Sequence, residues 1–440
     1  MAANRRHPRG ATDGLGQKGT GRVRVVAVCW ALLGSLVVMS DARRRLQIAY
    51  VSDGLYPYGQ WAGHRRFHEL AGRLSDRHEV HYFTWRFWDG PPDISDGGVL
   101  LHGIADPPTR YEAGGRLTRR EAMGFSRGLL SAIKRRRFDV IDCSARPRLP
   151  FYATWLGAWL AESPMIVTWH ELGDDHRDDV GRHGWKARLA QGIRARGLRL
   201  GRQHVAVSPM TADQLVKAGL PADRIWVVGN GLELEAFERA PKSAVESDIV
   251  FVGRLAEDKR VDLLIEAVAR LRAAQPELRC LIIGDGPQRP ALEALVAARG
   301  LVQQVWFMGH VEEVEKMSLL KASTILVMPA VREGFGIAAV EGQAAGLVPI
   351  VVRSGQSAAP TMIHDGVDGL VCDPTPDALA AALHALLGDP FRTALMRAAA
   401  GEAVRRRDWE WVTQQMELVY LDAGRPDESP DARARRLSWQ

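Results

Sequence analysis

Residues 248–286, DIVFVGRLAEDKRVDLLIEAVARLRAAQPELRCLIIGDG, decide the fold of this chain. An apolar run of strand length ends at Gly253, a helical stretch from Val261 to Arg272 comes next, and a second apolar run ends at Gly284. Continuous apolar strands that alternate with helices are typical of parallel sheets buried on both faces. This stretch therefore predicts a β-α-β unit with two parallel strands.

The same alternation extends along the chain in both directions. Toward the amino terminus the apolar runs are LQIAYVS (46–52), HEVHYFTW (78–85), FDVIDCS (138–144), MIVTWHE (165–171), HVAVS (204–208) and RIWVVGNG (224–231). Toward the carboxyl terminus they are QVWFMGHV (304–311), TILVMPA (324–330), VPIVVR (348–353) and GLVCD (369–373). Two doubly wound, Rossmann-like α/β domains are predicted, 46–235 and 248–407, with a linker at 236–247. Such sheets bind ligands at the carboxyl ends of their strands, so a shared ligand would lie between the domains.

The composition is that of an ordinary globular protein, with 46% hydrophobic and 25% charged residues among 440. The formal net charge of +6 is concentrated in residues 1–45, which hold nine Arg or Lys against two acids. The rest of the chain carries 49 bases against 50 acids, which argues against a nucleic-acid partner. The four cysteines form neither a CxxC pair nor a disulfide framework, which fits a reducing cytoplasm.

Residues 1–45 are interpreted as an amino-terminal extension. Val25 to Met39 is an apolar run of 15 residues between arginines, which is short for a membrane span. It lacks a small-x-small cleavage site, and the basic residues after it disfavour export. The favoured interpretation is that the protein starts at Met39, and a short membrane anchor is the alternative.

Two cations follow the first strand of the second domain. Gly253 ends that strand, Arg254 comes next, and Lys259 stands near the start of the following helix. Two cations that converge with a helix N-terminus make a natural phosphate site. The nearby GDGPQR has Arg289 at the sixth position of a GxGxxG frame, which argues against a dinucleotide cofactor.

REGFGIAAVEGQAAG, residues 332–346, places Glu333 and Glu341 around a glycine-rich turn that follows an apolar strand. The turn Gly334-Phe335-Gly336 lets the backbone approach a ligand, and the amides of the helix that starts at Ile337 suit a phosphate. Carboxylates are good acceptors for the vicinal hydroxyls of a ribose or hexose. Two glutamates could instead be the acid and nucleophile of a glycosidase, but that reaction does not require the two cations.

Four segments together closely resemble the retaining glycosyltransferases of family 4, which have the GT-B architecture. They are VGRLAEDKRVDLLIEAVARL, LIIGDGPQRPALEALVAARGL, VWFMGHV and EGFGIAAVEGQAAGLVPIVV. The resemblance covers residues 248–390 and implies that the second domain binds a nucleoside diphosphate sugar, the donor. The donor-binding residues that it implies are Gly253, Arg254, Lys259, Gly309, His310, Val311, Glu333, Gly334, Phe335, Gly336, Ile337 and Glu341.

The resemblance also implies a role for each group. Arg254 and Lys259 would bind the diphosphate, Glu333 and the glycines after it would lie near the transferred sugar, and Glu341 would bind the nucleotide ribose. The loop 309–311 would lie against the base. With these roles, the expected catalytic residues are His170, Arg254, Lys259 and Glu333.

The first domain resembles the family more loosely. In YPYGQWAGHRRFHELAGRL, Gly59 and Gly63 occupy the place of an acceptor-side glycine loop but are not adjacent. His170, in TWHELGDD, matches the histidine that these enzymes place by the donor sugar. Further along, a helix at 408–423 would cross back to the first domain, and the tail 424–440 is expected to be disordered.

Neither a metal nor another cofactor is expected. The acidic cluster after His170 does not have the HExxH spacing of a zinc site and fits a solvated loop. Residues 182–202 contain seven Arg or Lys and no acid, with apolar residues at four-residue spacing. This basic amphipathic helix could meet an anionic membrane that carries a lipid-linked acceptor, or pack on its sheet with a solvated rim.

The expected function is a retaining glycosyltransferase that moves a hexose to a saccharide or lipid-linked acceptor in cell-surface polysaccharide or glycolipid synthesis. The expected place is the cytoplasm, with peripheral attachment to the inner face of the plasma membrane. A GT-B sugar-nucleotide epimerase or phosphorylase would share the fold, and a non-catalytic sugar-nucleotide binding protein would share the donor site. Both alternatives stay open at the level of sequence.

Overall fold

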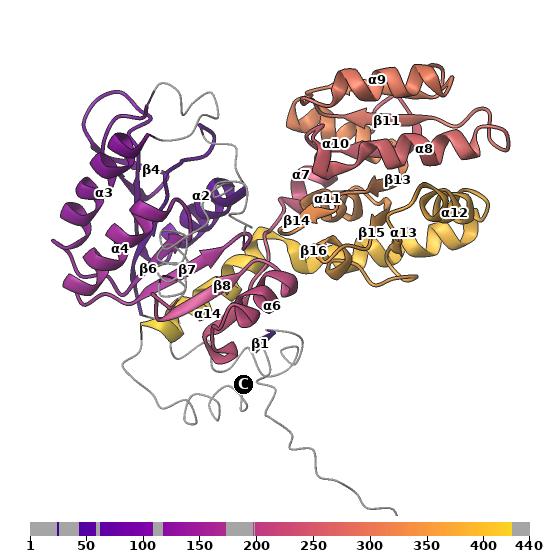
Figure 1. The fold of residues 1–440 in the computed structure, drawn as a ribbon. Coiled ribbons are helices and arrows are strands. Elements are labelled where there is room, and N and C mark those ends of the chain that lie inside the picture. Colours follow the sequence, from indigo (N-terminus) through magenta and orange to yellow (C-terminus); the bar gives the residue numbers. More distant parts are fainter. Residues whose placement is uncertain are drawn as a thin grey trace, which may run out of the picture.

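A computed structural model describes residues 24–25, 44–58, 62–108, 118–172, 197 and 199–424. They form two α/β domains, each built around its own sheet, and the last helix of the chain returns to the first domain (Figure 1). The expected features that lie outside the described residues are most of the amino-terminal extension with its apolar run, Gly59, the acidic cluster at 174–179, most of the basic segment 182–202 and the tail from 425. Among the described helices, none is long and apolar enough to cross a membrane.

The first domain contains a nine-stranded sheet in the order β1-β9-β8-β7-β6-β2-β3-β5-β4. Its strands are β1 (Arg24–Val25), β2 (Gln47–Val51), β3 (Glu79–Thr84), β4 (Asp93–Asp96), β5 (Val99–Gly103), β6 (Val140–Ser144), β7 (Met165–Trp169), β8 (Gln203–Ala206) and β9 (Ile225–Val227). Its helices are α2 (Ala62–Ser75), α3 (Arg119–Ile133), α4 (Arg148–Leu160), α6 (Pro209–Lys217) and the 3-10 turn η2 (Ala222–Arg224). All pairs are parallel except β4 with β5.

The second domain contains a six-stranded parallel sheet in the order β12-β11-β10-β13-β15-β17. Its strands are β10 (Ser247–Val252), β11 (Cys280–Ile283), β12 (Val305–Gly309), β13 (Ser323–Met328), β15 (Val348–Val352) and β17 (Leu370–Cys372), and β14 (Arg332–Glu333) pairs with β16 (Gln356–Ser357). Its helices are α8 (Val261–Leu271), α9 (Arg289–Ala298), α10 (Glu313–Lys321), α11 (Ile337–Ala344), α12 (Pro376–Leu387) and α13 (Pro390–Val404). Three 3-10 turns are η3 (Glu257–Lys259), η4 (Ala359–Thr361) and η5 (Arg405–Arg407).

Both sheets reverse their strand order at one point, which confirms the doubly wound fold. In the first sheet the reversal lies between β2 and β6, and in the second it lies between β10 and β13. Ligands of such sheets bind outside the carboxyl ends of the strands at this point. This rule points to residues that follow β2 and β6 in the first domain and β10 and β13 in the second. Strands β7 and β8 lie next beyond β6 and are parallel to it, so they end at the same edge of the first sheet.

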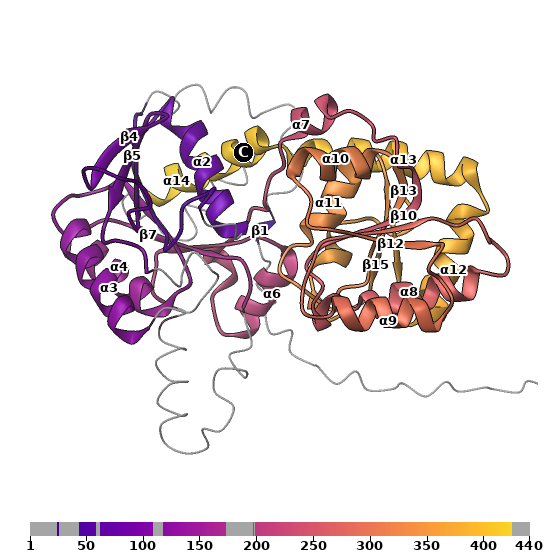
Figure 2. The same ribbon diagram turned by 90° about the horizontal axis from the view of Figure 1, so that it is seen from above.

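Alternation along β2 explains why helices cover both faces of the first sheet (Figure 2). Ile48 and Tyr50 pack with α2 and the carboxyl-terminal helix α14 (Trp409–Ala423), whereas Ala49 and Val51 pack with α3 and α4. Successive side chains of a strand point to opposite faces, so a run without polar residues must be buried on both. The apolar runs in the sequence thus reflect the burial of both faces of the sheet.

The segment between the domains is partly helical. Residues 236–247 were expected to be a linker, yet α7 (Leu234–Arg239) includes part of them and Ser247 already belongs to β10. Phe237 is buried in the core of the second domain, where it contacts apolar side chains of that domain. The charged residues of this stretch form the solvent-exposed face of a short amphipathic helix. The overall composition of the stretch does not reveal this helix, because it does not show on which face each residue lies.

A hairpin in the first domain was not predicted. β4 and β5 are joined by Gly97 and Gly98, whose φ angles are +53° and +83°. Two residues of positive φ are the requirement of the tight turns that join antiparallel strands, and a glycine pair is a sequence signal for them. The polar residues of β4 masked the signal, because this edge strand faces solvent along most of its length.

Candidate active site

The two domains meet closely where His170 follows β7 and Gly334 follows β14. A Cβ atom added to Gly334 would lie 2.2 Å from the carbonyl oxygen of His170. The hydroxyl of Ser208, the N-cap of α6, donates a hydrogen bond to the carbonyl oxygen of Gly334 at 2.8 Å. Only glycine fits an approach this close, so Gly334 is explained by contact between the domains.

His170 is enclosed by groups from the first domain on its other side. A Cβ added to Gly63 of α2 would lie 2.9 Å from His170 Nε2, and this nitrogen is buried without a hydrogen-bond partner among the described residues. Burial, and to a lesser degree the charges of Arg66 and His64, lower the pKa of His170 to about 3. The imidazole is therefore neutral at physiological pH and has one ring nitrogen for a ligand.

Lys259 and Glu333, two of the expected catalytic residues, form an ion pair. Lys259 Nζ donates to Glu333 Oε1, and a second carboxylate, that of Asp258, lies 3.7 Å from the same ammonium. The backbone holds the two loops together, because the amide of Val331 donates to the Asp258 carbonyl at 3.0 Å. The structure thus brings the turn after β10 and the turn after β13 to one place at the point of strand reversal.

Glycines allow the loops after β10, β11 and β12 to pack backbone against backbone. A Cβ on Gly284 would lie 2.0 Å from the carbonyl oxygen of Gly253. The amide of Gly284 donates a hydrogen bond to the carbonyl oxygen of Gly309 at 2.7 Å. The glycines of the GDG motif therefore form a close strand-to-helix turn. Arg254 is exposed at the end of β10, and His310 is exposed after β12.

The other residues of the glycine-rich turn differ in exposure. Gly336 has φ +90° and is the N-cap of α11, whose first residue is Ile337. Phe335 is buried in the core of the second domain, and the guanidinium carbon of Arg407 lies 5.7 Å from its ring centroid. Phe335 was expected among the donor-binding residues, in a turn that lets the backbone approach a ligand, and its side chain is occupied by packing. Any contact of this residue with a ligand would have to use its backbone.

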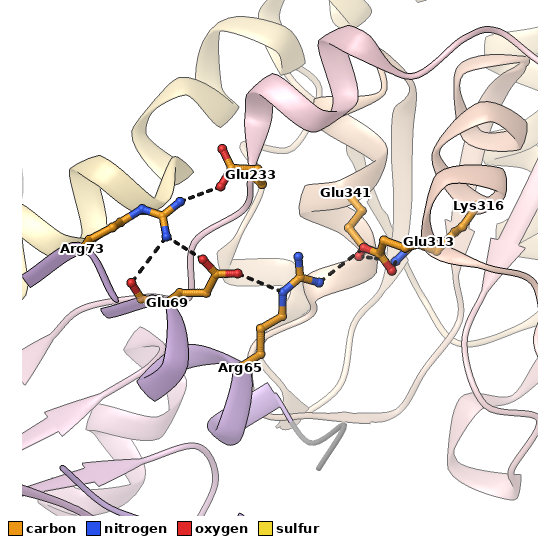
Figure 3. A network of polar contacts seen from close by, with 7 residues as sticks. All are labelled: Arg65, Glu69, Arg73, Glu233, Glu313, Lys316 and Glu341. Atoms are coloured by element: carbon orange, nitrogen blue, oxygen red, sulfur yellow. Dashed lines mark hydrogen bonds and ion pairs between the residues drawn. The ribbon is translucent and has the colours of Figure 1, made fainter. Parts of the chain in front are cut away.

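Glu341 is buried on α11 and its carboxylate is already paired. Lys316 Nζ of α10 donates to Glu341 Oε1 at 2.8 Å and lies 2.9 Å from Glu313 Oε2. Glu313 in turn lies 3.3 Å from Arg65 Nη1, which belongs to α2 in the first domain (Figure 3). The residue expected at the ribose is thus connected by ion pairs to the opposite domain. Within the described residues, no group of three or more His, Cys, Asp and Glu is placed to hold a metal ion.

Comparison with known families covers nearly all of both domains. Residues 234–407 match the family of glycosyl transferases group 1, and residues 62–231 match the glycosyl transferase 4-like domain. Both domains therefore belong to glycosyltransferase families. A D-inositol 3-phosphate glycosyltransferase of Thermobispora bispora is 29% identical over 399 residues, which are 81% of this chain and 88% of the relative. A glycogen synthase of Mycobacterium tuberculosis is 29% identical over 359 residues, 78% of this chain and 84% of the relative.

Solved structures are similar to this glycosyltransferase over most of its length. Sucrose-phosphate synthase from Thermosynechococcus elongatus has a TM-score of 0.66 at 20% identity and covers 86% of this chain and 98% of its own. Anabaena HepE, solved with UDP and glucose, has a TM-score of 0.64 at 18% identity, with 85% and 99% covered. These neighbours confirm the predicted GT-B fold.

Several polar residues of this glycosyltransferase were missed by reasoning from its sequence. Ser208 was named only as the end of the apolar run 204–208, and Lys316 and Arg65 were not singled out. The Ser-Pro pair at 208–209 does signal a helix start. Nothing in the sequence indicates that the partner of Ser208 is a carbonyl 126 residues away.

Proposed function

We propose that this glycosyltransferase moves a hexose, with retention of anomeric configuration, from a nucleoside diphosphate sugar to a saccharide or lipid-linked acceptor. The observation that carries the proposal is the convergence of Lys259, Glu333 and the amino end of α11 opposite His170. The proposal places the enzyme in the retaining family 4, in cell-surface polysaccharide or glycolipid synthesis.

The relatives support this choice of substrates. Anabaena HepE was solved with UDP-glucose as well as with UDP and glucose, which supports a nucleoside diphosphate sugar as donor. The relatives are named for an inositol phosphate and for glycogen, both polyhydroxylated acceptors. The proposed acceptor here is therefore a saccharide, either free or linked to a lipid.

The proposed chemistry is electrostatic stabilisation of the leaving diphosphate. Cleavage of the anomeric bond develops negative charge on the phosphate and oxocarbenium character on the sugar. Arg254, Lys259 and the amides at the amino end of α11 would stabilise the phosphate, each by about 3 kcal/mol. These groups would take the place of a metal ion in this reaction.

Glu333 and His170 would act on the sugar. The ion pair with Lys259 fixes the Glu333 carboxylate, which can accept hydrogen bonds from sugar hydroxyls. The neutral imidazole of His170 presents Nε2, and its carbonyl oxygen lies at the surface where the two domains touch. Because the ring carries no charge, it can contact a sugar that becomes cationic without repelling it.

The proposed place of action is the cytoplasmic face of a membrane. The three cysteines in the described residues, Cys143, Cys280 and Cys372, are free thiols, which supports a reducing compartment. The contact with anionic lipid would be made by the basic segment 182–202. Co-sedimentation with anionic liposomes at low salt tests this part, and failure of the lipid to retain the protein would remove it from the proposal.

Thermal stabilisation by nucleoside diphosphates tests the donor site. A ligand at 100 times its dissociation constant should add about 2.7 kcal/mol to the free energy of unfolding. We expect one of UDP, GDP and ADP to stabilise the wild type, and Lys259→Ala to lose the effect. Lys217→Ala, which removes an exposed cation of α6, should keep it. If no nucleotide stabilises the wild type, the phosphate site and the proposed function are wrong.

Product analysis separates transfer from the alternative reactions. With the donor identified, a transferase forms a glycosylated product only when an acceptor is present. An epimerase would convert the sugar nucleotide without an acceptor, and a phosphorylase would need phosphate. A binding protein would show stabilisation by the nucleotide and no turnover.

A further inference from the structure

Seven charged side chains of alternating sign connect the buried glutamate of α11 to the first domain (Figure 3). In order along the chain of contacts they are Glu341, Lys316, Glu313, Arg65, Glu69, Arg73 and Glu233. The link between Glu313 and Arg65, at 3.3 Å, is the one that crosses from α10 to α2. Glu341 and Lys316 are 7% and 15% exposed, so this end of the series is the best shielded from solvent.

Lys316 is the cation on which Glu341 depends. Burial alone would lower the pKa of Lys316, but the ion pairs with Glu341 and Glu313 outweigh it and leave the pKa above its ordinary value. A buried carboxylate without such a partner would tend to take up a proton. The bond from Lys316 uses Oε1 of Glu341, which leaves Oε2 to accept from a ligand hydroxyl.

The carboxylate of Glu313 forms one ion pair with each domain. Its Oε2 lies 2.9 Å from Lys316 and its Oε1 lies 3.3 Å from Arg65. Burial raises the pKa of Glu313, but Lys316 and then Arg65 lower it below its ordinary value. Arg65 thus shares this carboxylate with Lys316 from the opposite domain.

We propose that Lys316 is a positioning residue that holds the Glu341 carboxylate in place for the ribose of the donor. We further propose that Arg65 strengthens this hold from the opposite domain by sharing the charge of Glu313. The inference rests on the proposed function, since it assigns the ribose to Glu341. It makes ribose recognition, which is local to the second domain, sensitive to the closure of the first domain onto it.

Discrimination between ribose and dideoxyribose measures this role directly. The probes are the nucleoside diphosphate that stabilises the wild type and its 2′,3′-dideoxy analogue, and the quantity is the ratio of their dissociation constants. We expect Lys316→Met to weaken the ribonucleotide about tenfold while leaving the dideoxy analogue unchanged. Lys316→Arg should restore discrimination, and Glu315→Gln, an exposed change on the same helix, should leave it as in the wild type.

The dideoxy analogue distinguishes positioning from a loss of structure. A damaged fold would weaken the binding of both nucleotides, whereas a misplaced Glu341 carboxylate would weaken only the nucleotide that has ribose hydroxyls. A Lys316→Met variant with the wild-type ratio of dissociation constants would overturn the proposal.

A double substitution tests the part played by Arg65. Arg65→Met should reduce discrimination about threefold, because the full charge of Glu313 then competes for Lys316. Adding Glu313→Gln removes the competitor, so the double variant should return to the wild-type ratio. If the double variant is as poor as Arg65→Met alone, the coupling is overturned. If no nucleotide binds the wild type, the proposed function itself is refuted. That outcome is distinguishable from a failure of the coupling, in which the wild type binds a nucleotide but the variants do not change the ratio as expected.

Discussion

Gly334 is the position at which one added methyl group tests whether contact between the domains is needed for turnover. In Gly334→Ala the new Cβ would lie 2.2 Å from the carbonyl oxygen of His170. The φ angle of Gly334 is outside the left-handed region, so alanine does not strain its own backbone. The obstacle is a backbone atom rather than a flexible side chain, so the domains must move apart by roughly 1 Å to restore an ordinary contact.

A displacement of about 1 Å between a substrate and its catalytic groups can cost about a hundredfold in rate. We therefore expect Gly334→Ala to lower kcat about a hundredfold. The dissociation constant of the nucleotide should change by less than about twofold, since the expected nucleotide contacts belong to the second domain alone. Initial rates with the donor identified by thermal stabilisation give the first quantity, and calorimetric titration with the nucleoside diphosphate gives the second.

Gly355→Ala is the matched control for this substitution. Gly355 is exposed in the loop before β16, and no heavy atom lies within 4 Å of a Cβ built there. The control should keep the wild-type rate and affinity. The reasoning would be refuted if Gly334→Ala kept more than half of the wild-type kcat, because the close approach would then not be a feature of the state that turns over.

Three further substitutions test the electrostatics and the backbone. Burial raises the pKa of Asp142 to about 6 from an ordinary 3.8, so the fold favours the neutral acid and stability is lost as pH rises between these values. Relative to wild type, Asp142→Asn should therefore gain about 3 kcal/mol in free energy of unfolding between pH 3.5 and 7. Urea denaturation at both pH values checks this, and a constant difference would contradict it. Because the pKa of His170 is lowered to about 3, the wild type and His170→Asn should share every inflection of kcat/KM between pH 5 and 8. An inflection near pH 6.5 that disappears in the variant would show that the histidine titrates there. Gly284→Ala combines φ +129° with a Cβ 2.0 Å from the Gly253 carbonyl oxygen and should lower the free energy of unfolding by more than about 3 kcal/mol. Gly366→Ala, with φ +76° in open space, should lose only about 1 kcal/mol, and equal urea midpoints for the two variants would exclude the clash.

Strand and helix positions could be predicted because they depend on local burial. Each apolar run assigned to the two domains overlaps a strand, from β2 to β17, since a strand covered on both faces cannot include solvated residues. The β4–β5 hairpin was missed because β4 is an exposed edge strand with a polar sequence. The helical part of the linker was missed because its one buried anchor, Phe237, stands among charged residues.

Some features of the site could be predicted from the sequence and others could not, depending on how far apart the contacting residues lie along the chain. The sequence indicated that Lys259, Glu333 and Glu341 follow or flank strand ends, and topology then brought Lys259 to Glu333. It did not indicate that Lys316 would neutralise Glu341, because the spacing of charges within α10 shows only partners on the same helix. A side chain on another element can be identified only when both elements have been placed.

The sequence by itself thus determined two doubly wound domains and the strand ends at which polar residues gather, since periodicity and glycine turns reflect interactions a few residues long. Only the tertiary structure decided that Gly334 touches His170, that Ser208 donates to the same turn and that Arg65 reaches Glu313. These contacts join residues 126 to 248 positions apart in sequence. Their existence depends on how two separate sheets pack against each other, and that arrangement is set by the complementarity of whole surfaces rather than by any local pattern.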